Sequence, residues 1–239
     1  MSYILALETA TTACSAALCT FDGAVVAESL SLEGPAHAQR LMPGVHEVLD
    51  AAEATWASID AIAVSLGPGA FTGLRIGVAT ARALAQADGH VDLIGVPTCT
   101  ALALALADVA GGVTERRLIP LIDGRRRELF AAVYEVQSAG GAPRQVEDVQ
   151  VVAADELGEW LAARGPAVVG GDGAVLHADK VPGAVRCVSS VVAPTAAYVG
   201  RAAALGVPGL INESGAVLPI YGRAPDAARW AFGGAGGRT

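Results

Sequence analysis

The architecture follows from one stretch of the chain, Ile62-Ala63-Val64-Ser65-Leu66-Gly67-Pro68-Gly69-Ala70-Phe71-Thr72-Gly73-Leu74-Arg75-Ile76-Gly77. Its apolar first part predicts a buried strand, and Gly67-Pro68-Gly69 can neither continue a strand nor form a helix interior. Ala, Leu, Val and Arg dominate the residues that follow to about Ala87, which predicts a helix with Thr72 as its candidate N-cap. A strand, a tight glycine turn and a helix start direct backbone N–H groups at one point, where an anion could bind.

Two phosphate-binding motifs do not fit this turn. A dinucleotide fingerprint requires a third glycine where the chain has Thr72, and a Walker loop requires Gly-Lys-Ser/Thr, whereas Lys180 is the only lysine in the sequence. The turn therefore has two interpretations. It is an anion site, or it is a glycine turn that only allows the helix to pack closely.

The composition indicates a well-buried α/β protein. Hydrophobic residues make up 53% of the 239 residues and charged residues 17%, a balance typical of folded chains. The net charge of −8 argues against a broad nucleic-acid-binding surface but is compatible with a local basic patch. The four cysteines lack metal or disulfide spacing, and the longest uncharged run, 93–107, is too short to span a bilayer. We therefore expect a soluble, cytoplasmic protein.

The order of predicted elements repeats once. The first half has expected strands at 3–7, 14–20, 24–30, 62–66 and 93–96, and helices at 37–53, 73–87 and 99–109. The second half has strands at 118–122, 128–136 and 167–169, a loop and strand within 143–152, and helices at 154–163 and 194–205. Glu8 and Asp123 follow the first strand of each half. This pattern predicts two duplicated lobes, 1–112 and 113–222, with a ligand cleft between them, and a disordered tail at 223–239.

Five blocks of sequence, taken in order, carry a resemblance to a known family. They are Ile4-Leu5-Ala6-Leu7-Glu8-Thr9-Ala10-Thr11, His37-Ala38-Gln39-Arg40-Leu41-Met42-Pro43, the stretch from Gly67 to Gly77, Asp123-Gly124-Arg125 with Glu128, and Pro219-Ile220-Tyr221. These blocks resemble the TsaB (YeaZ) family, whose members are also labelled M22 glycoprotease homologues. The resemblance implies an α/β fold of the actin/Hsp70/sugar-kinase (ribonuclease H-like) type, with two duplicated lobes of mixed sheets flanked by helices.

The resemblance also implies a function. Family members take part in making N6-threonylcarbamoyladenosine at position 37 of tRNA, and they are similar to the transferase TsaD without performing the transfer. They bind TsaD as a heterodimer, and TsaE joins the complex. We therefore expect a non-catalytic scaffold that organises TsaD, self-associates as a weak dimer, meets tRNA through the complex, and requires no cofactor and no membrane. The alternative is an ATP-dependent kinase or carbamoyl transferase of the same fold.

The chain departs from the family pattern at three places. Glu8 stands where the family usually has Asp, and the bulky Arg127 stands where a small residue is common. Thr98-Cys99-Thr100-Ala101-Leu102 stands where TsaD has a metal-binding His-x-x-x-His. Because His37 and His46 lie on opposite faces of one predicted helix, we expect no protein-held metal ion. A peptidase is disfavoured as well, since Ser65 lacks the G-x-S-x-G surroundings of an activated nucleophile.

A vestigial nucleotide site is the first candidate site. Glu8 and Asp123 occupy the positions where phosphotransferases of this fold hold Mg²⁺. The full candidate set is Glu8, Thr9, Thr11, Thr12, Asp123, Gly170 and Gly171. The alternative is that the two carboxylates only accept hydrogen bonds from turn amides.

A cluster of arginines is the second candidate site, and it comprises Arg116, Arg117, Arg125, Arg126 and Arg127. These side chains could contact tRNA phosphates or an acidic face of a partner, or they lie in solvated turns. The arginines after Asp123 would also fill the space that a second phosphate loop needs.

A stripe of small residues at every fourth position of the glycine-turn helix is the third candidate site, because such residues share one helix face and let another backbone approach. The proposed partner surface comprises Gly73, Gly77, Ala81 and Ala85, the flanking Leu74 and Val78, and an apolar ridge of Leu41, Val45 and Val48 on the preceding helix. The alternative is that the stripe packs on the chain's own sheet or on that helix.

Overall fold

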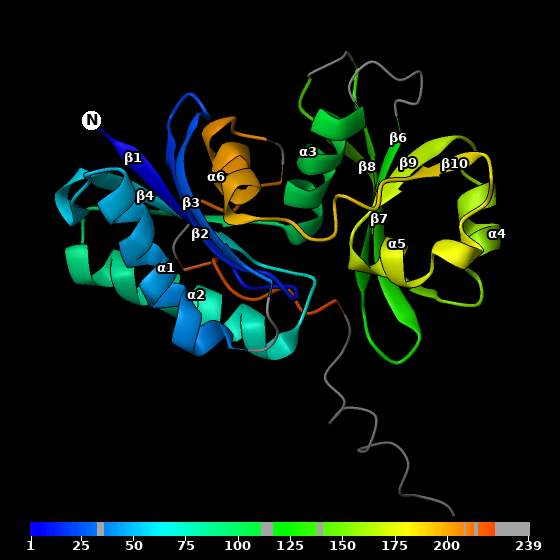
Figure 1. The fold of residues 1–239 in the computed structure, drawn as a ribbon, viewed down its shortest axis with the longest axis horizontal. Coiled ribbons are helices and arrows are strands. Elements are labelled where there is room, and N and C mark those ends of the chain that lie inside the picture. Colours follow the sequence, from blue (N-terminus) through cyan, green and yellow to red (C-terminus); the bar gives the residue numbers. More distant parts are fainter. Residues whose placement is uncertain (33–35, 111–116, 138–140, 208, 213–214, 223–239) are drawn as a thin grey trace, which may run out of the picture.

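The computed structural model describes residues 1–32, 36–110, 117–137, 141–207, 209–212 and 215–222. Figure 1 shows two lobes side by side, each built on one sheet. Arg116 and the predicted tail at 223–239 lie outside the described residues. No helix in the described part of the chain is long and apolar enough to span a bilayer.

The first sheet consists of β1 (Tyr3–Glu8), β2 (Cys14–Thr20), β3 (Val25–Ser31), β4 (Ile59–Ser65) and β5 (Asp92–Val96), in the order β3-β2-β1-β4-β5. β1 is antiparallel to β2 and parallel to β4, so it occupies the centre. Its nearly continuous apolar sequence is buried along its whole length, as expected for a strand covered on both faces, whereas the edge strand β3 is largely exposed.

The second sheet repeats this order. It consists of β6 (Arg117–Asp123), β7 (Glu128–Glu135), β8 (Arg144–Ala153), β9 (Ala167–Gly170) and β10 (Val185–Cys187), arranged β10-β9-β6-β7-β8. In both sheets the first strand of the lobe is central, the next two follow antiparallel on one side, and the last two lie parallel on the other. The predicted duplicated fold is confirmed, and Glu8 and Asp123 end equivalent strands.

Helices fill the space around and between the sheets. α1 (His37–Ala51) and α2 (Phe71–Asp88) cover the outer face of the first sheet, and α4 (Leu157–Ala162) and α5 (Asp172–Leu176) cover the outer face of the second (Figure 1). α3 (Thr98–Ala110) and α6 (Ala196–Ala204) lie between the two sheets (Figure 1). Two short 3-10 turns, 56–58 and 178–180, precede β4 and β10.

The last helix of each lobe packs against the sheet of the other lobe. α6 contributes Val199 to a core shared with Ile4 and Ala6 of β1, and a Cβ at Gly200 would lie 2.5 Å from Cys19 Sγ. α3 in turn packs on the second sheet, where Leu102 and Leu106 share a core with strand β6. Each sheet is therefore covered on its inner face by a helix from the other half of the chain. The division into domains 1–112 and 113–222 stays a prediction.

Most predicted elements are present, with changes at their ends. α2 begins at Phe71 and its N-cap is Ala70, so the N-cap predicted at Thr72 is wrong. The helix predicted at 154–163 is shortened to Leu157–Ala162. α5 and β10 were not predicted, because five and three residues are too few to show a periodicity.

The C-terminal residues 209–212 and 215–222 lie against the first lobe and reach the space between the lobes (Figure 1). Ile211 pairs antiparallel with Gly95 at the edge of β5. Further along, the side chain of Val217 is fully buried, and the Ile220 N–H donates to the Leu66 carbonyl at 2.6 Å. These contacts fix the segment so that Tyr221 and Gly222 border a cleft between the lobes.

Candidate functional site

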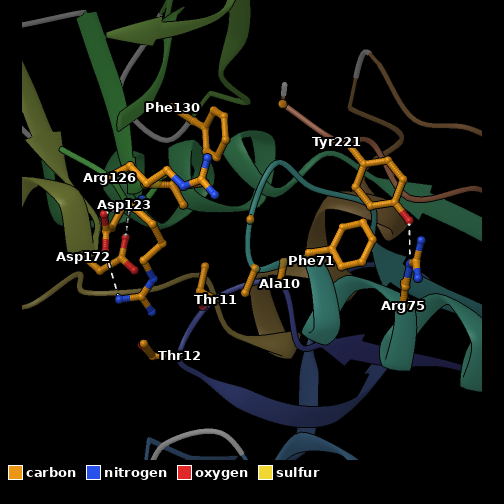
Figure 2. Close-up of a pocket in the computed structure, with 16 residues that line it drawn as sticks. Ala10, Thr11, Thr12, Phe71, Arg75, Asp123, Arg126, Phe130, Asp172 and Tyr221 are labelled. Carbon is orange, nitrogen blue, oxygen red and sulfur yellow. Dashed lines mark hydrogen bonds and ion pairs between the residues drawn. The ribbon is translucent and has the colours of Figure 1, made fainter. Parts of the chain in front are cut away.

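A cleft of about 580 Å³ lies between the lobes. Figure 2 shows the loop after β1 at its base, the start of α2 and the C-terminal segment on one side, and the β6–β7 turn on the other. Its lining residues come from five segments: Ala10, Thr11, Thr12, Gly69, Ala70, Phe71, Arg75, Ile122, Asp123, Gly124, Arg125, Arg126, Phe130, Asp172, Tyr221 and Gly222. The volume lies within the range of about 300–1,000 Å³ that is usual for small-molecule sites.

Glu8 lies behind the cleft and does not line it. Its carboxylate is fully buried, accepts a hydrogen bond from the Ser65 hydroxyl and accepts another from the Ala10 N–H at 2.5 Å. Burial raises the pKa of Glu8 to about 7, and the hydrogen bonds from Ser65 and the loop amides oppose that rise. The carboxyl therefore joins β1, β4 and the loop, which matches the turn-carboxylate alternative rather than a metal-facing role.

The threonines of the same loop divide into two groups. Thr9 is buried and its hydroxyl donates to the Gly73 carbonyl at 2.8 Å, so it fastens the loop to α2. Thr11 and Thr12 line the cleft, and their role in a nucleotide site stays a prediction. Thr11 is positioned by the buried His37, whose Nε2 lies 3.0 Å from the Thr11 carbonyl oxygen.

Three glycines in the glycine turn and the first part of α2 allow close packing. A Cβ at Gly69 would lie 2.1 Å from the Ala10 carbonyl oxygen, and one at Gly73 would lie 2.0 Å from that of Thr9. A Cβ at Gly77 would lie 2.3 Å from the Thr9 hydroxyl. Any other residue at these positions would push α2 away from the loop, so these glycines position the helix start at the cleft.

The predicted partner stripe lies in the core of the first lobe, so this part of the prediction is corrected. Ala81 is fully buried, Gly73 and Gly77 pack on Thr9, and Ala85 is half-buried against the same core. The other members are also buried, namely Leu41, Val45, Val48, Leu74 and Val78. A partner could reach these side chains only by separating α1 and α2 from the first sheet.

The β6–β7 turn holds three consecutive arginines in the left-handed backbone region. The φ angles are 62° at Arg125, 55° at Arg126 and 61° at Arg127, a conformation that is costly for residues other than glycine. Arg125 and Arg126 line the cleft. Arg127 turns away, and its guanidinium donates to both oxygens of Asp155 at 2.9 Å.

Both carboxylates that line the cleft are already hydrogen-bonded. Asp123 accepts from the Arg125 N–H at 2.8 Å and forms an ion pair with the Arg125 guanidinium at 3.2 Å. Asp172 accepts from the N–H groups of Asp123 and Gly173 at 2.8 and 2.9 Å. Burial raises the pKa of Asp172, and these backbone hydrogen bonds oppose the shift. Among the described residues, no group of His, Cys, Asp and Glu side chains is arranged to hold a metal ion.

Three other predicted residues lie away from the cleft. Arg117 begins β6 at the opposite end of that strand, where it pairs with Glu135 at 3.2 Å, so the arginines do not form one patch. Gly170 and Gly171 are not among the residues that line the cleft. A Cβ at Gly170 would lie 2.6 Å from Leu106, and one at Gly171 would lie 2.1 Å from the Leu121 carbonyl oxygen. These two glycines serve packing at the end of β9.

An aromatic group at the mouth of the cleft was not predicted from the sequence. Phe71 and Tyr221 have ring centroids 4.9 Å apart, and the Arg75 guanidinium lies 3.8 Å above the Phe71 ring. Arg75 also donates to the Tyr221 hydroxyl at 3.0 Å, so both of these contacts are with aromatic residues. The available signals were an aromatic residue at the helix start and the block Pro219-Ile220-Tyr221, and neither indicated that the two meet.

Comparisons with known proteins identify the family. Residues 31–204 match the family described as "TsaD: tRNA N6-adenosine threonylcarbamoyltransferase". The chain is 39% identical over 137 residues to TsaB of Escherichia coli (57% of each chain), and 27% identical over 228 residues to TsaB of Bacillus subtilis (95% of this chain, 94% of the relative). The structure of YeaZ from Pseudomonas aeruginosa matches with a TM-score of 0.75 at 29% identity, covering 92% of this chain and 100% of that one.

Coverage of the relatives varies. The chain spans 40% of the length of a Mycobacterium leprae relative that is 38% identical over 154 residues, which is 62% of this chain. The E. coli and B. subtilis relatives are both named tRNA threonylcarbamoyladenosine biosynthesis protein TsaB. Because the family match covers well over half of the chain, and these relatives and the P. aeruginosa structure agree, the chain belongs to the TsaB (YeaZ) group of the TsaD family.

Proposed function

We propose that this chain is a non-catalytic subunit of the complex that makes N6-threonylcarbamoyladenosine at position 37 of tRNA. In this role it binds and organises TsaD, TsaE joins the complex, and the chain acts in the cytoplasm. The observation that carries the proposal is the state of the two equivalent carboxylates. Glu8 is buried and bound to Ser65, and Asp123 is paired with Arg125, so neither is available for catalysis as arranged.

We assign the partner surface to the outer face of α2, defined by Arg75, Ala79, Ala83 and Ala87. All four are exposed, and they recur at every fourth position on the side opposite the buried stripe. Three alanines in this row allow a partner's backbone to approach closely. Phe71 at one end of the face is 53% exposed and supplies the kind of aromatic anchor that dominates binding energy at many interfaces. The same face would serve a weak homodimer, which would compete with TsaD.

The test is capture of a TsaD-type partner by the variant Ala83→Arg. A charged side chain in a close contact is expected to weaken binding at least tenfold and to abolish tRNA modification in a reconstituted assay. The matched control is Ala162→Arg, which changes an exposed helical alanine in the second lobe and should bind normally. Both variants should keep the parent's circular dichroism spectrum and melting temperature.

The result decides between the scaffold and the kinase or transferase alternative. If folded Ala83→Arg binds and supports modification like the parent, the outer face of α2 is not the partner surface. If the isolated chain hydrolyses ATP and Asp123→Ala abolishes that hydrolysis, the non-catalytic role is wrong.

A further inference from the structure

Two large aromatic side chains stay exposed where the C-terminal segment, residues 215–222, meets the start of α2. Phe71 is 53% exposed and Tyr221 is 39% exposed, and their ring centroids lie 4.9 Å apart. Exposed apolar side chains that adjoin one another, unlike scattered ones, mark interaction surfaces. Phe71 also ends the outer face of α2, so the pair continues the surface that we assign to the partner.

Arg75 joins the two rings into one unit. Its guanidinium lies 3.8 Å from the centroid of the Phe71 ring, and its Nε donates to the Tyr221 hydroxyl at 3.0 Å (Figure 2). Side chains that are already held in place lose little conformational freedom on binding, and Tyr and Arg are enriched among the residues that dominate binding energy. We call Phe71, Arg75 and Tyr221 the arginine–aromatic cluster.

The backbone that carries Tyr221 is fixed to the first lobe. The side chain of Val217 is fully buried in the core of that lobe, and Arg82 donates to the Val217 carbonyl at 3.0 Å. The Ile220 N–H donates to the Leu66 carbonyl at 2.6 Å. Tyr221 therefore presents its ring from a fixed backbone, which further reduces the entropy that binding would cost.

The cluster carries a positive charge that only neutral groups hold. Arg75 contacts a phenol hydroxyl and two aromatic rings, and among the described residues no carboxylate pairs with it. The exposed Ala79 and Ala83, further along the same face of α2, add no charge. A complementary surface is therefore apolar opposite the rings and carries a carboxylate opposite Arg75.

We propose, building on the proposed function, that the TsaD-type partner covers this cluster as well as the outer face of α2. Phe71 and Tyr221 enter an apolar pocket of the partner, and a carboxylate at the rim of that pocket pairs with Arg75. The partner surface then extends from α2 onto the C-terminal segment. In this interface the row of alanines allows close approach, and the cluster supplies apolar area and charge.

Biolayer interferometry with a purified TsaD-type subunit and the immobilised full chain tests this surface. Tyr221→Ala removes the ring and the hydrogen bond to Arg75, and it should weaken binding about tenfold or more. Tyr221→Phe keeps the ring and should retain most of the affinity. The matched control is Leu218→Ala, which removes a side chain that is 54% exposed on the same segment but lies outside the cluster, and it should bind like the parent.

Salt dependence separates the charge from the apolar contact. Arg75→Gln removes the charge at an exposed position, so it should weaken binding and reduce the dependence of the affinity on NaCl concentration. Tyr221→Phe should keep the salt dependence of the parent, because Arg75 remains. If Tyr221→Ala lowers the melting temperature, Arg75→Gln decides, because it leaves the C-terminal segment intact.

The outcomes distinguish this surface from the proposed function on which it rests. If Ala83→Arg abolishes binding while Tyr221→Ala and Arg75→Gln bind like the parent, the extension onto the C-terminal segment is wrong and the α2 face stands. Equal weakening by Tyr221→Ala and Leu218→Ala would reflect the segment as a whole and would overturn the role of the cluster. A change in self-association alone, measured by sedimentation velocity with partner binding unchanged, would assign the cluster to a second copy of the chain and overturn the proposal.

Discussion

Replacing Glu8 by Gln should change how stability depends on pH. The carboxyl is fully buried, and burial raises its pKa from 4.5 to about 7. The folded chain therefore holds this proton more tightly than the unfolded chain. The contribution of the group to the free energy of unfolding is complete below about pH 4.5 and is lost as the pH rises to about 7. The difference of about 2.5 between the two pKa values corresponds to about 3 kcal/mol.

Urea denaturation of Glu8→Gln and of the parent chain across this pH range measures the effect. Glutamine keeps the shape and can still bond to Ser65 and the Ala10 N–H, but it does not ionise. The free energy of unfolding of the variant, minus that of the parent, should rise by about 3 kcal/mol between about pH 4.5 and about pH 7.5. Glu159→Gln, at an exposed position in α4, should give a flat difference. A flat difference for Glu8→Gln as well would refute the claim that burial raises the pKa of Glu8.

Two further sets of substitutions test the roles of predicted site residues. Ala81→Arg should destabilise the chain by about 3–5 kcal/mol, because it places an unpaired charge in the core. Thermal melting of Ala81→Arg beside Ala83→Arg, whose site is exposed, measures the contrast. A normal melting temperature for Ala81→Arg would contradict the burial of the stripe. If Arg125 and Arg126 contact tRNA phosphates in the assembled complex, as their exposure allows, Arg125→Ala combined with Arg126→Ala should weaken tRNA binding and lower its salt dependence. Unchanged binding at two salt concentrations would place both arginines in a solvated turn.

The sequence predicted the sheets better than the surfaces. Strand ends at Glu8 and Asp123 were found because the first nearly all-apolar segment of each half is followed directly by a carboxylate. The buried stripe of α2 was misassigned for a specific reason. The helix has small residues at every fourth position on two opposite faces, and the rows that start at Gly73 and at Arg75 show the same spacing. Spacing alone does not say which row faces the sheet.

The walls of the cleft depended on contacts between distant parts of the chain. Arg75 and Tyr221 are 146 residues apart, and their hydrogen bond exists because Ile220 is fixed to Leu66. The left-handed turn at Arg125 to Arg127 was also hidden, since a run of three arginines gives no turn signal of the kind that glycine or asparagine gives. Local propensity therefore identified the elements, and tertiary contacts decided what surrounds the ligand space.

The two lobes share one sheet topology, but the loops that follow their first strands, β1 and β6, differ in chemistry. Equivalent central strands end in Glu8 and Asp123, but Glu8 is enclosed by Ser65 and the loop amides, whereas Asp123 is paired with Arg125 at the cleft surface. A pair of equivalent carboxylates that faced each other across a cleft would suit a shared cation. Here Glu8 is buried in the first lobe and Asp123 is paired with Arg125, so the two equivalent strands do not present a matched pair of free carboxylates to the cleft. One sheet topology therefore supports two different environments for the carboxylate that ends its central strand.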